Sequence, residues 1–279
     1  MKKILVILAV MLMSFACSSE KKEASTTEAA PAPAATGSVL DEIVKRGELH
    51  VGLEAGYMPF ELKNKQGDIV GFDVDMAERM AKDLGVKLVL VNTAWDGIIP
   101  SLLTKKFDII MSGMTVTPER NVQVNFASPY ITIGQTILIH KKHEGVVKSY
   151  ADLNDPKYII STKLGVTADY ATKRFMPNAT IRLFETEQEA VMEVINGKAD
   201  AFVYDLPYNA SFFSQNSENL VFLDDPFTYE PLAWAVRKGD YDFMNWLNNF
   251  LAQVKGDGFY EETYNKWFLT SDWLKDVQE

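Results

Sequence analysis

The chain has 279 residues, a formal net charge of −10 and a single cysteine. One cysteine cannot form an intramolecular disulfide, so the folded part must be stabilised by its core. The acidic balance argues against nucleic acid as a partner, because neutralising phosphates requires a basic surface. No apolar segment reaches the roughly 20 residues that a membrane-spanning helix needs, which predicts an exported protein that is not integral to the membrane.

The N-terminus has the pattern of a secretory signal, with Met1-Lys2-Lys3 followed by an apolar run over residues 4–15. Ser14-Phe15-Ala16 precedes Cys17 and places small residues where signal peptidase reads them, while the same stretch resembles a bacterial lipobox. We expect a signal peptide over 1–17 and favour lipidation of Cys17, which would anchor the protein on the periplasmic or extracytoplasmic side of a membrane. The alternative is a cysteine that merely follows the cleavage site.

Residues 18–37 contain no aromatic residue and no Val, Ile, Leu or Met. Such a segment cannot bury enough apolar surface to become ordered, and we expect a disordered tether. The remaining stretch of about 240 residues is large for one core and sufficient for two.

From Glu48 onward, strand-like and helix-like patterns alternate, as in βαβ units with a mostly parallel sheet. The first group comprises strands at 49–53, 86–91 and 107–111 and helices at 76–84 and 98–106. A long strand over 131–140 then leaves this group and crosses into a second one. The second group comprises strands at 158–160, 180–184 and 199–204 and helices at 166–176 and 187–196, and the chain closes with a strand at 232–236 and helices at 240–254 and 258–268.

A short internal echo indicates two related lobes. Residues 103–110 and residues 195–202 each read as a helix end, a tight turn and a strand that delivers polar residues at its carboxyl end. Ligands of open α/β sheets bind at those carboxyl ends. Two such lobes facing each other would form a cleft between domains, which is a favoured place for a ligand.

The run from Ser112 to Arg120 carries the strongest local signal. A buried strand ends in Ser-Gly, and a helix then begins with Thr117 as N-cap and Pro118 at its first position. Arg120 lies in the first turn, where the helix dipole disfavours a cation. Backbone N–H groups, hydroxyls and a guanidinium suit a small anion such as a carboxylate. A capped helix with one surface arginine is the alternative.

Five motifs extend this signal over roughly residues 39–270. They are VGLEAGYMPFE (51–61), GFDVDMA (71–77), WDGIIPSL (95–102), SGMTVTPER (112–120) and FASPY (126–130). In order and spacing they resemble the extracytoplasmic solute-binding proteins of polar amino-acid ABC transporters, bacterial solute-binding protein family 3. The resemblance implies an α/β, two-lobed type II periplasmic binding protein-like fold whose two strand crossovers form a hinge. Its lobes would be 38–134 and 135–231, with 232–279 returning to the first.

The resemblance also assigns the groups that hold the backbone of an amino acid. Arg120 would pair with the α-carboxylate through two N–H groups, and Thr115 would add a hydroxyl and an N–H. Gly113 would offer its carbonyl to the α-ammonium, and Asp205 would bind that ammonium from the second lobe. Thr167, at a helix start, would supply N–H groups to the carboxylate. For Asp205 a simple N-cap role is the alternative.

The side chain of the ligand would meet Tyr57 and Trp95, whose rings lie in loops after strands and would sandwich it. Glu54 would reach its far end, where a carboxylate favours a cationic or amide-bearing ligand: Arg, Lys, His or Gln. Core packing of the rings and an exposed Glu54 are the alternatives. The chain departs from the family at Val166, usually a hydroxyl residue, and at Lys163, often glutamine.

The resemblance implies a monomer without cofactor or metal that delivers its amino acid to an ABC permease in the inner membrane. An amino-acid sensor that signals to a receptor would carry the same site. A dehydratase-type enzyme is a further alternative, with Glu54, Asp205 or a histidine as acid–base group. The chain has no Gly-x-Ser-x-Gly elbow, P-loop or metal-ligand spacing, which favours binding without chemistry.

Overall fold

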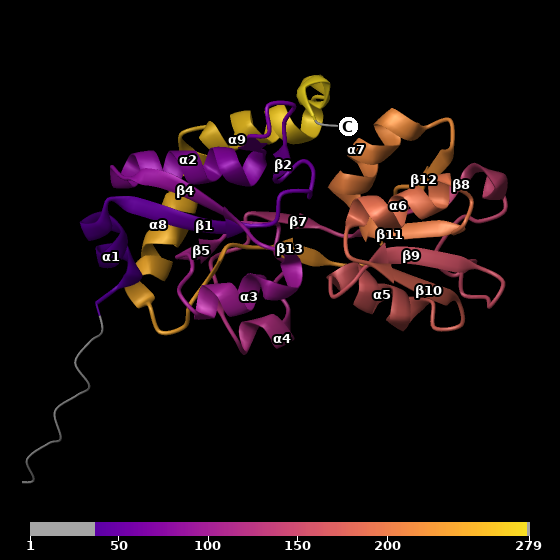
Figure 1. Ribbon diagram of the computed structural model, residues 1–279, viewed down its shortest axis with the longest axis horizontal. Coiled ribbons are helices and arrows are strands. Elements are labelled where there is room, and N and C mark those ends of the chain that lie inside the picture. Colours follow the sequence, from indigo (N-terminus) through magenta and orange to yellow (C-terminus); the bar gives the residue numbers. More distant parts are fainter. Residues whose placement is uncertain (1–36, 278–279) are drawn as a thin grey trace, which may run out of the picture. The chain divides into compact units, whose positions relative to one another are not determined.

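The computed structural model describes residues 37–277, which form two lobes, each built on a five-stranded sheet (Figure 1). The expected α/β fold with two lobes is therefore confirmed. The predicted signal peptide, Cys17 and the tether up to residue 36 lie outside the described residues. In the described part of the chain, no helix combines the length and the apolar character that crossing a bilayer demands.

The sheet of the first lobe has the order β4-β1-β5-β14-β6, with β1 parallel to both β4 and β5 and β14 antiparallel to its neighbours. Its strands are β1 (Glu48–Leu53), β4 (Lys87–Asn92), β5 (Ile109–Ile110), β6 (Asn125–Phe126) and β14 (Ala235–Val236). A hairpin, β2 (Leu62–Lys63) with β3 (Ile69–Val70), lies outside the sheet. The helices are α1 (Val39–Arg46), α2 (Phe72–Leu84), α3 (Trp95–Leu103), α4 (Pro118–Asn121), α8 (Tyr241–Gly256) and α9 (Phe259–Tyr264).

The sheet of the second lobe has the order β10-β9-β11-β8-β12, parallel from β10 to β11 and antiparallel beyond. Its strands are β8 (Gln135–His140), β9 (Ile159–Lys163), β10 (Thr180–Phe184), β11 (Ala201–Asp205) and β12 (Leu220–Leu223). Its helices are α5 (Thr167–Phe175), α6 (Glu187–Ile195) and α7 (Leu206–Asn216).

A two-stranded antiparallel pair, β7 (Ile131–Ile133) with β13 (Glu230–Leu232), connects the sheets. The single strand predicted over 131–140 is therefore wrong in one respect, because it breaks at Gly134, where the chain leaves this pair for the second sheet. A Cβ atom on Gly134 would lie 2.4 Å from the carbonyl oxygen of Thr228. The strand predicted over 232–236 likewise divides between β13 and β14.

The echo between residues 103–110 and 195–202 is present in the hydrogen bonding of both sheets. Asp108 Oδ2 accepts the backbone N–H of His50 at 2.9 Å, and its own N–H donates to the carbonyl of His50. Asp200 makes the same two bonds with Ile159, at 2.9 Å through Oδ2 and 2.7 Å through its N–H. Each aspartate thus ties the turn before one strand to the first part of the neighbouring strand, and so helps to fix the register of the two strands.

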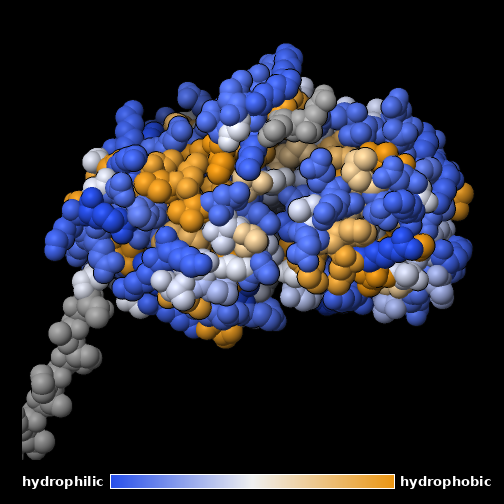
Figure 2. All heavy atoms as spheres, viewed as in Figure 1, coloured by the Kyte–Doolittle hydropathy of each residue, from blue (hydrophilic) through white to orange (hydrophobic). Residues whose placement is uncertain are grey.

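The core of the first lobe is rich in stacked aromatic rings. Tyr130 stacks on Phe72 and on Trp234, and these three side chains are at most 3% exposed. The hydroxyl of Tyr130 and the indole N–H of Trp234 both donate to the buried carboxylate of Asp73, at 3.0 and 3.3 Å. On the face seen in Figure 2, apolar residues gather over the edge of this sheet, where β4 keeps half-buried leucine and valine side chains.

Candidate ligand-binding site

Both lobes contribute to one small cavity at the carboxyl ends of their strands. The cavity measures about 20 Å³ and adjoins a wider cleft of about 1210 Å³. It is lined by Glu54, Tyr57, Trp95, Ser112, Gly113, Thr115, Arg120, Val166, Thr167, Tyr204 and Asp205. The structure therefore brings together all eight residues that the sequence proposed for ligand binding. A volume of ~10–15 Å³ accommodates one water molecule, so this cavity is too small for an amino acid in the described arrangement of the lobes.

Arg120 extends its guanidinium along the wall of the cavity. Its backbone N–H donates to Thr117 Oγ1 at 3.2 Å, so Thr117 caps the short helix α4 as predicted. The Nη1 atom donates to the Thr115 carbonyl at 3.0 Å, and the guanidinium lies 5.1 Å from the centre of the Trp95 ring. No carboxylate of residues 37–277 forms an ion pair with Arg120. Burial lowers the pKa of Arg120, while Glu230 and Asp205 act in the opposite direction.

Gly113 allows an aromatic ring to pack directly on the backbone. Its φ is +52°, and a Cβ atom would lie 2.2 Å from Cε1 of Tyr57, so any other residue would be excluded on both grounds. The N–H of Gly113 donates to Asp73 Oδ2 at 3.0 Å. Tyr57 is 6% exposed, stacks on Phe60 and donates its hydroxyl to Asp205 in the other lobe.

Asp205 ends β11 at the N-cap position of α7, but its side chain makes no capping hydrogen bond. The alternative is therefore right about the N-cap position, but the side chain of Asp205 does not cap the helix. The carboxylate instead accepts from the Tyr57 hydroxyl and from Gln135 Nε2. Burial raises the pKa of Asp205 to about 7, and the Glu230 carboxylate reinforces this, whereas Tyr57, Gln135 and Arg120 oppose it. Asp205 is thus a buried carboxylate suited to an incoming cation.

Gln135 is a site residue that the sequence analysis missed. It is the first residue of β8, and its Nε2 also donates to Thr167 Oγ1 at 3.3 Å, while its buried Oε1 has no partner among residues 37–277. Thr167 begins α5, and Val166 before it provides no side-chain cap, which leaves the first N–H groups of the helix for another acceptor. The sequence does contain one signal for this role: Gln135 is a polar amide residue directly after Gly134, at the start of a largely apolar strand.

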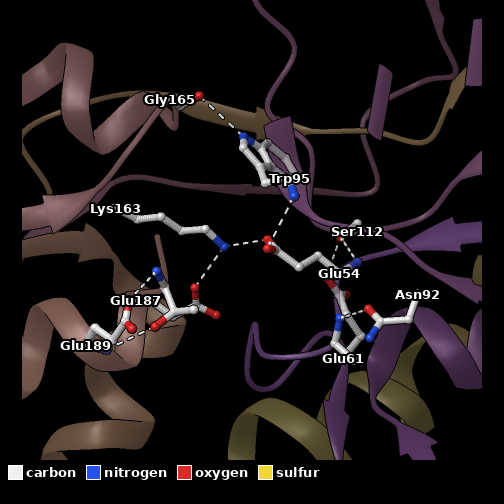
Figure 3. A network of polar contacts seen from close by, with 11 residues as sticks. Glu54, Glu61, Asn92, Trp95, Ser112, Lys163, Gly165, Glu187 and Glu189 are labelled. Atoms are coloured by element: carbon white, nitrogen blue, oxygen red, sulfur yellow. Dashed lines mark hydrogen bonds and ion pairs between the residues drawn. The ribbon is translucent and has the colours of Figure 1, made fainter. Parts of the chain in front are cut away.

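Glu54 does not project freely into the cavity. Its Oε1 accepts the backbone N–H of Trp95 at 3.2 Å, and its Oε2 pairs with the ammonium of Lys163 from the second lobe (Figure 3). Trp95 is the first residue of α3 and not a loop residue as predicted. Its indole N–H donates across the cleft to the Gly165 carbonyl at 3.3 Å. Burial raises the pKa of Glu54, and Lys163 opposes this.

Two α/β lobes joined by a pair of strands, with an arginine and an aspartate facing one cavity from opposite lobes, define a binding protein that holds its ligand between domains. Residues 49–270 match the model of the bacterial extracellular solute-binding proteins, family 3. The chain belongs to this family.

Individual relatives agree with this assignment. The chain is 31% identical over 225 residues to ABC transporter arginine-binding protein 1 of Escherichia coli (strain K12), a match that covers 79% of this chain and 90% of that protein. A protein from Wolinella succinogenes DSM 1740, solved in complex with lysine, is 57% identical with a TM-score of 0.81, covering 83% of this chain and all of the other. The ancestral amino-acid-binding protein AncCDT-1, described as a precursor of cyclohexadienyl dehydratase, is 52% identical with a TM-score of 0.79 and the same coverage.

Proposed function

We propose that this protein binds a free L-amino acid between its lobes and delivers it to an ABC importer. The observation that carries the proposal is the presence of Arg120 and Asp205 on opposite lobes around one cavity. The guanidinium suits the α-carboxylate, to which Thr115 and the N-terminus of α5 at Thr167 add donors. Asp205 and the Gly113 carbonyl suit the α-ammonium. Such a ligand touches both lobes at once and so stabilises their closed arrangement.

The energy available from these groups is sufficient. Micromolar binding corresponds to about 8 kcal/mol. Two buried charge-assisted interactions contribute roughly 1.5–3 kcal/mol each, and burial of the ligand side chain against Tyr57 and Trp95 adds to them.

The proposed ligand is polar or basic: Arg, Lys, His or Gln. Glu54 is the residue that supports this choice, because its carboxylate lies where the side chain of the ligand would extend and would repel an acidic one. The arginine-binding relative and the lysine complex of the Wolinella protein point to the same class.

The proposed setting is the periplasm or another extracytoplasmic space, with lipidated Cys17 as the anchor and a permease in the inner membrane as partner. A monomer suffices, since all eight binding residues belong to one chain.

We propose binding without chemistry. The three histidines bond to Glu48, to the Lys142 backbone and to Asp200, and none of them lines the cavity. Glu54 and Asp205 do line it, but Glu54 is paired with Lys163, and Asp205 accepts from Tyr57 and Gln135 and suits the α-ammonium of an amino acid. The genomic neighbourhood distinguishes a transport protein from a sensor. Permease and ATPase genes beside the gene of this protein would indicate transport, whereas a receptor gene there would indicate a sensor.

The test is a thermal-shift screen of the twenty amino acids followed by calorimetry. We expect Arg120→Lys and Asp205→Asn to weaken binding at least 100-fold, because a lysine cannot make a two-pronged contact and an amide carries no charge. Arg182→Lys and Asp272→Asn, on exposed side chains, are the matched controls. Wild-type affinity in either site variant, or no stabilisation by any amino acid, would refute the proposal. Recovery of an altered compound after binding would restore the enzyme hypothesis.

A further inference from the structure

Lys163 joins the two lobes through a buried ion-pair cluster. It ends β9, and its side chain is 3% exposed. Its ammonium donates to Glu187 Oε2 at 2.8 Å within the second lobe and to Glu54 Oε2 in the first lobe (Figure 3). We call these three residues the Glu54–Lys163–Glu187 cluster. The cluster therefore crosses the cleft beside the amino-acid site.

Both carboxylates of the cluster are held in place by other contacts. Glu54 accepts from the Trp95 backbone, and its own N–H donates to Ser112 Oγ at 3.1 Å. Glu187 is the first residue of α6, where the helix dipole favours a negative charge. A Cβ atom on Gly56 would lie 3.0 Å from Glu187 Oε1, so the bare glycine backbone of the first lobe makes room for a carboxylate of the second.

The cluster contains two carboxylates and one ammonium, and so carries a formal charge of −1. Burial lowers the pKa of Lys163, but Glu187 and Glu54 outweigh it and raise that pKa overall, which keeps the ammonium charged. Glu54 lines the small cavity and the wide cleft, whereas Lys163 lines the cleft alone. A ligand held by Arg120 and Asp205 would therefore extend its side chain toward a carboxylate that already has an intramolecular cation.

We infer that Lys163 determines specificity by competing with the side chain of the ligand for Glu54, an inference that rests on the proposed amino-acid binding. A cationic ligand side chain can reach the Glu54 carboxylate in two ways. It either shares this carboxylate with Lys163, or it displaces the Lys163 ammonium, which then pairs with Glu187 alone. Lys163 thereby limits the preference for cationic over neutral ligands. Glu187 has the opposite effect, because it offers Lys163 a second partner and adds negative charge.

The experiment compares L-arginine with L-citrulline, its uncharged isostere, by calorimetry on the full chain. The variants are Lys163→Gln and Glu187→Gln, with Lys173→Gln as control, since Lys173 makes a half-exposed ion pair on α5 outside the cluster. The measured quantity is the ratio of the citrulline Kd to the arginine Kd. Any general effect of the lost contact on lobe closure changes both constants alike and cancels in this ratio.

We expect the ratio to rise at least tenfold in Lys163→Gln, to fall at least threefold in Glu187→Gln and to stay within twofold in the control. A ratio within twofold of wild type in Lys163→Gln, or a fall there, overturns the inference. Glu187→Gln decides if Lys163→Gln shows no cooperative melting, and L-glutamine replaces citrulline as the neutral ligand if citrulline binds too weakly. If amino acids stabilise the wild type but the ratio does not respond, the inference fails and the proposed function stands.

Discussion

Amino-acid binding should weaken as the pH falls from 7 to 5, because Asp205 must be ionised to pair with the α-ammonium of the ligand. Burial and Glu230 raise the pKa of this carboxyl to about 7, and Tyr57, Gln135 and Arg120 limit the rise. Among residues 37–277, the carboxylate accepts hydrogen bonds only from Tyr57 and Gln135. A ligand ammonium would be the first full positive charge in contact with it, and would lower its pKa in the complex.

The size of the effect follows from linkage between proton and ligand binding. With a pKa of about 7, roughly one tenth of the Asp205 carboxyls are ionised at pH 6 and roughly one hundredth at pH 5. The affinity should therefore fall about fivefold from pH 7 to pH 6 and about tenfold from pH 6 to pH 5, which correspond to about 1 and about 1.4 kcal/mol. Binding at pH 6 should release about 0.9 proton into the solvent.

Calorimetry with L-arginine, whose own groups do not titrate between pH 5 and 7, measures both quantities. The proton release is obtained from titrations in buffers that differ in ionisation enthalpy. Asp205→Asn binds weakly, and its residual affinity should lose the pH dependence that Asp205 causes. Any dependence that remains is assigned to Asp73, whose pKa burial raises to about 6 and whose carboxylate accepts the Gly113 N–H. A wild-type affinity that is flat from pH 7 to pH 5, or that rises as the pH falls, would show that Asp205 is ionised before the ligand arrives and would refute the reasoning.

Two further predictions concern stability. Glu61 is fully buried, accepts through Oε1 from Ser112 and leaves Oε2 without a partner in the described part of the chain. Burial and Asp73 raise its pKa well above the ordinary glutamate value of 4.5. The folded state then keeps a proton that the unfolded chain releases, so the contribution of Glu61 to the free energy of unfolding falls as the pH rises above 4.5. The free energy of unfolding of Glu61→Gln, measured in urea, should therefore increase relative to that of the wild type from pH 5 to pH 8. A constant difference between the two proteins would contradict this. Gly134→Ala should cost about 1–3 kcal/mol, because its Cβ would press on the Thr228 carbonyl. The control Gly256→Ala has open space around it and should be neutral or stabilising, and equal effects of the two changes would speak against a steric cause.

Much of the fold was predictable because the signals are local. The strand at 180–184 and the helix starting at residue 187 follow from hydrophobic pattern and capping, and Thr186 forms the complete capping box with Glu189. The breaks at Gly134 and between β13 and β14 were not predictable in this way. The residues on both sides of each break have strand character, and only the pairing of distant strands decides that the chain changes partners.

The gathering of the proposed backbone-binding residues around one cavity was predicted mainly through the family resemblance, with a local signal only in the run from Ser112 to Arg120. Parallel pairing brings the carboxyl ends of β1 and β5, and of β9 and β11, to one edge of each sheet, and Gly113 and Asp205 line the cavity there, with Arg120 on α4 nearby. The sequence pattern places these residues at or after strand ends, and the resemblance to the family indicates that they meet at one site. The side-chain part depends on pairs formed between lobes, such as Lys163 with Glu54, and these have no signature in either segment alone. A single carboxylate in the sequence therefore indicates a cation partner but not whether the ligand or the protein supplies it. In this chain Lys163 already supplies that cation. The preference for a cationic over a neutral ligand therefore depends on how easily the Lys163 ammonium gives up its contact with Glu54 and keeps the contact with Glu187 alone.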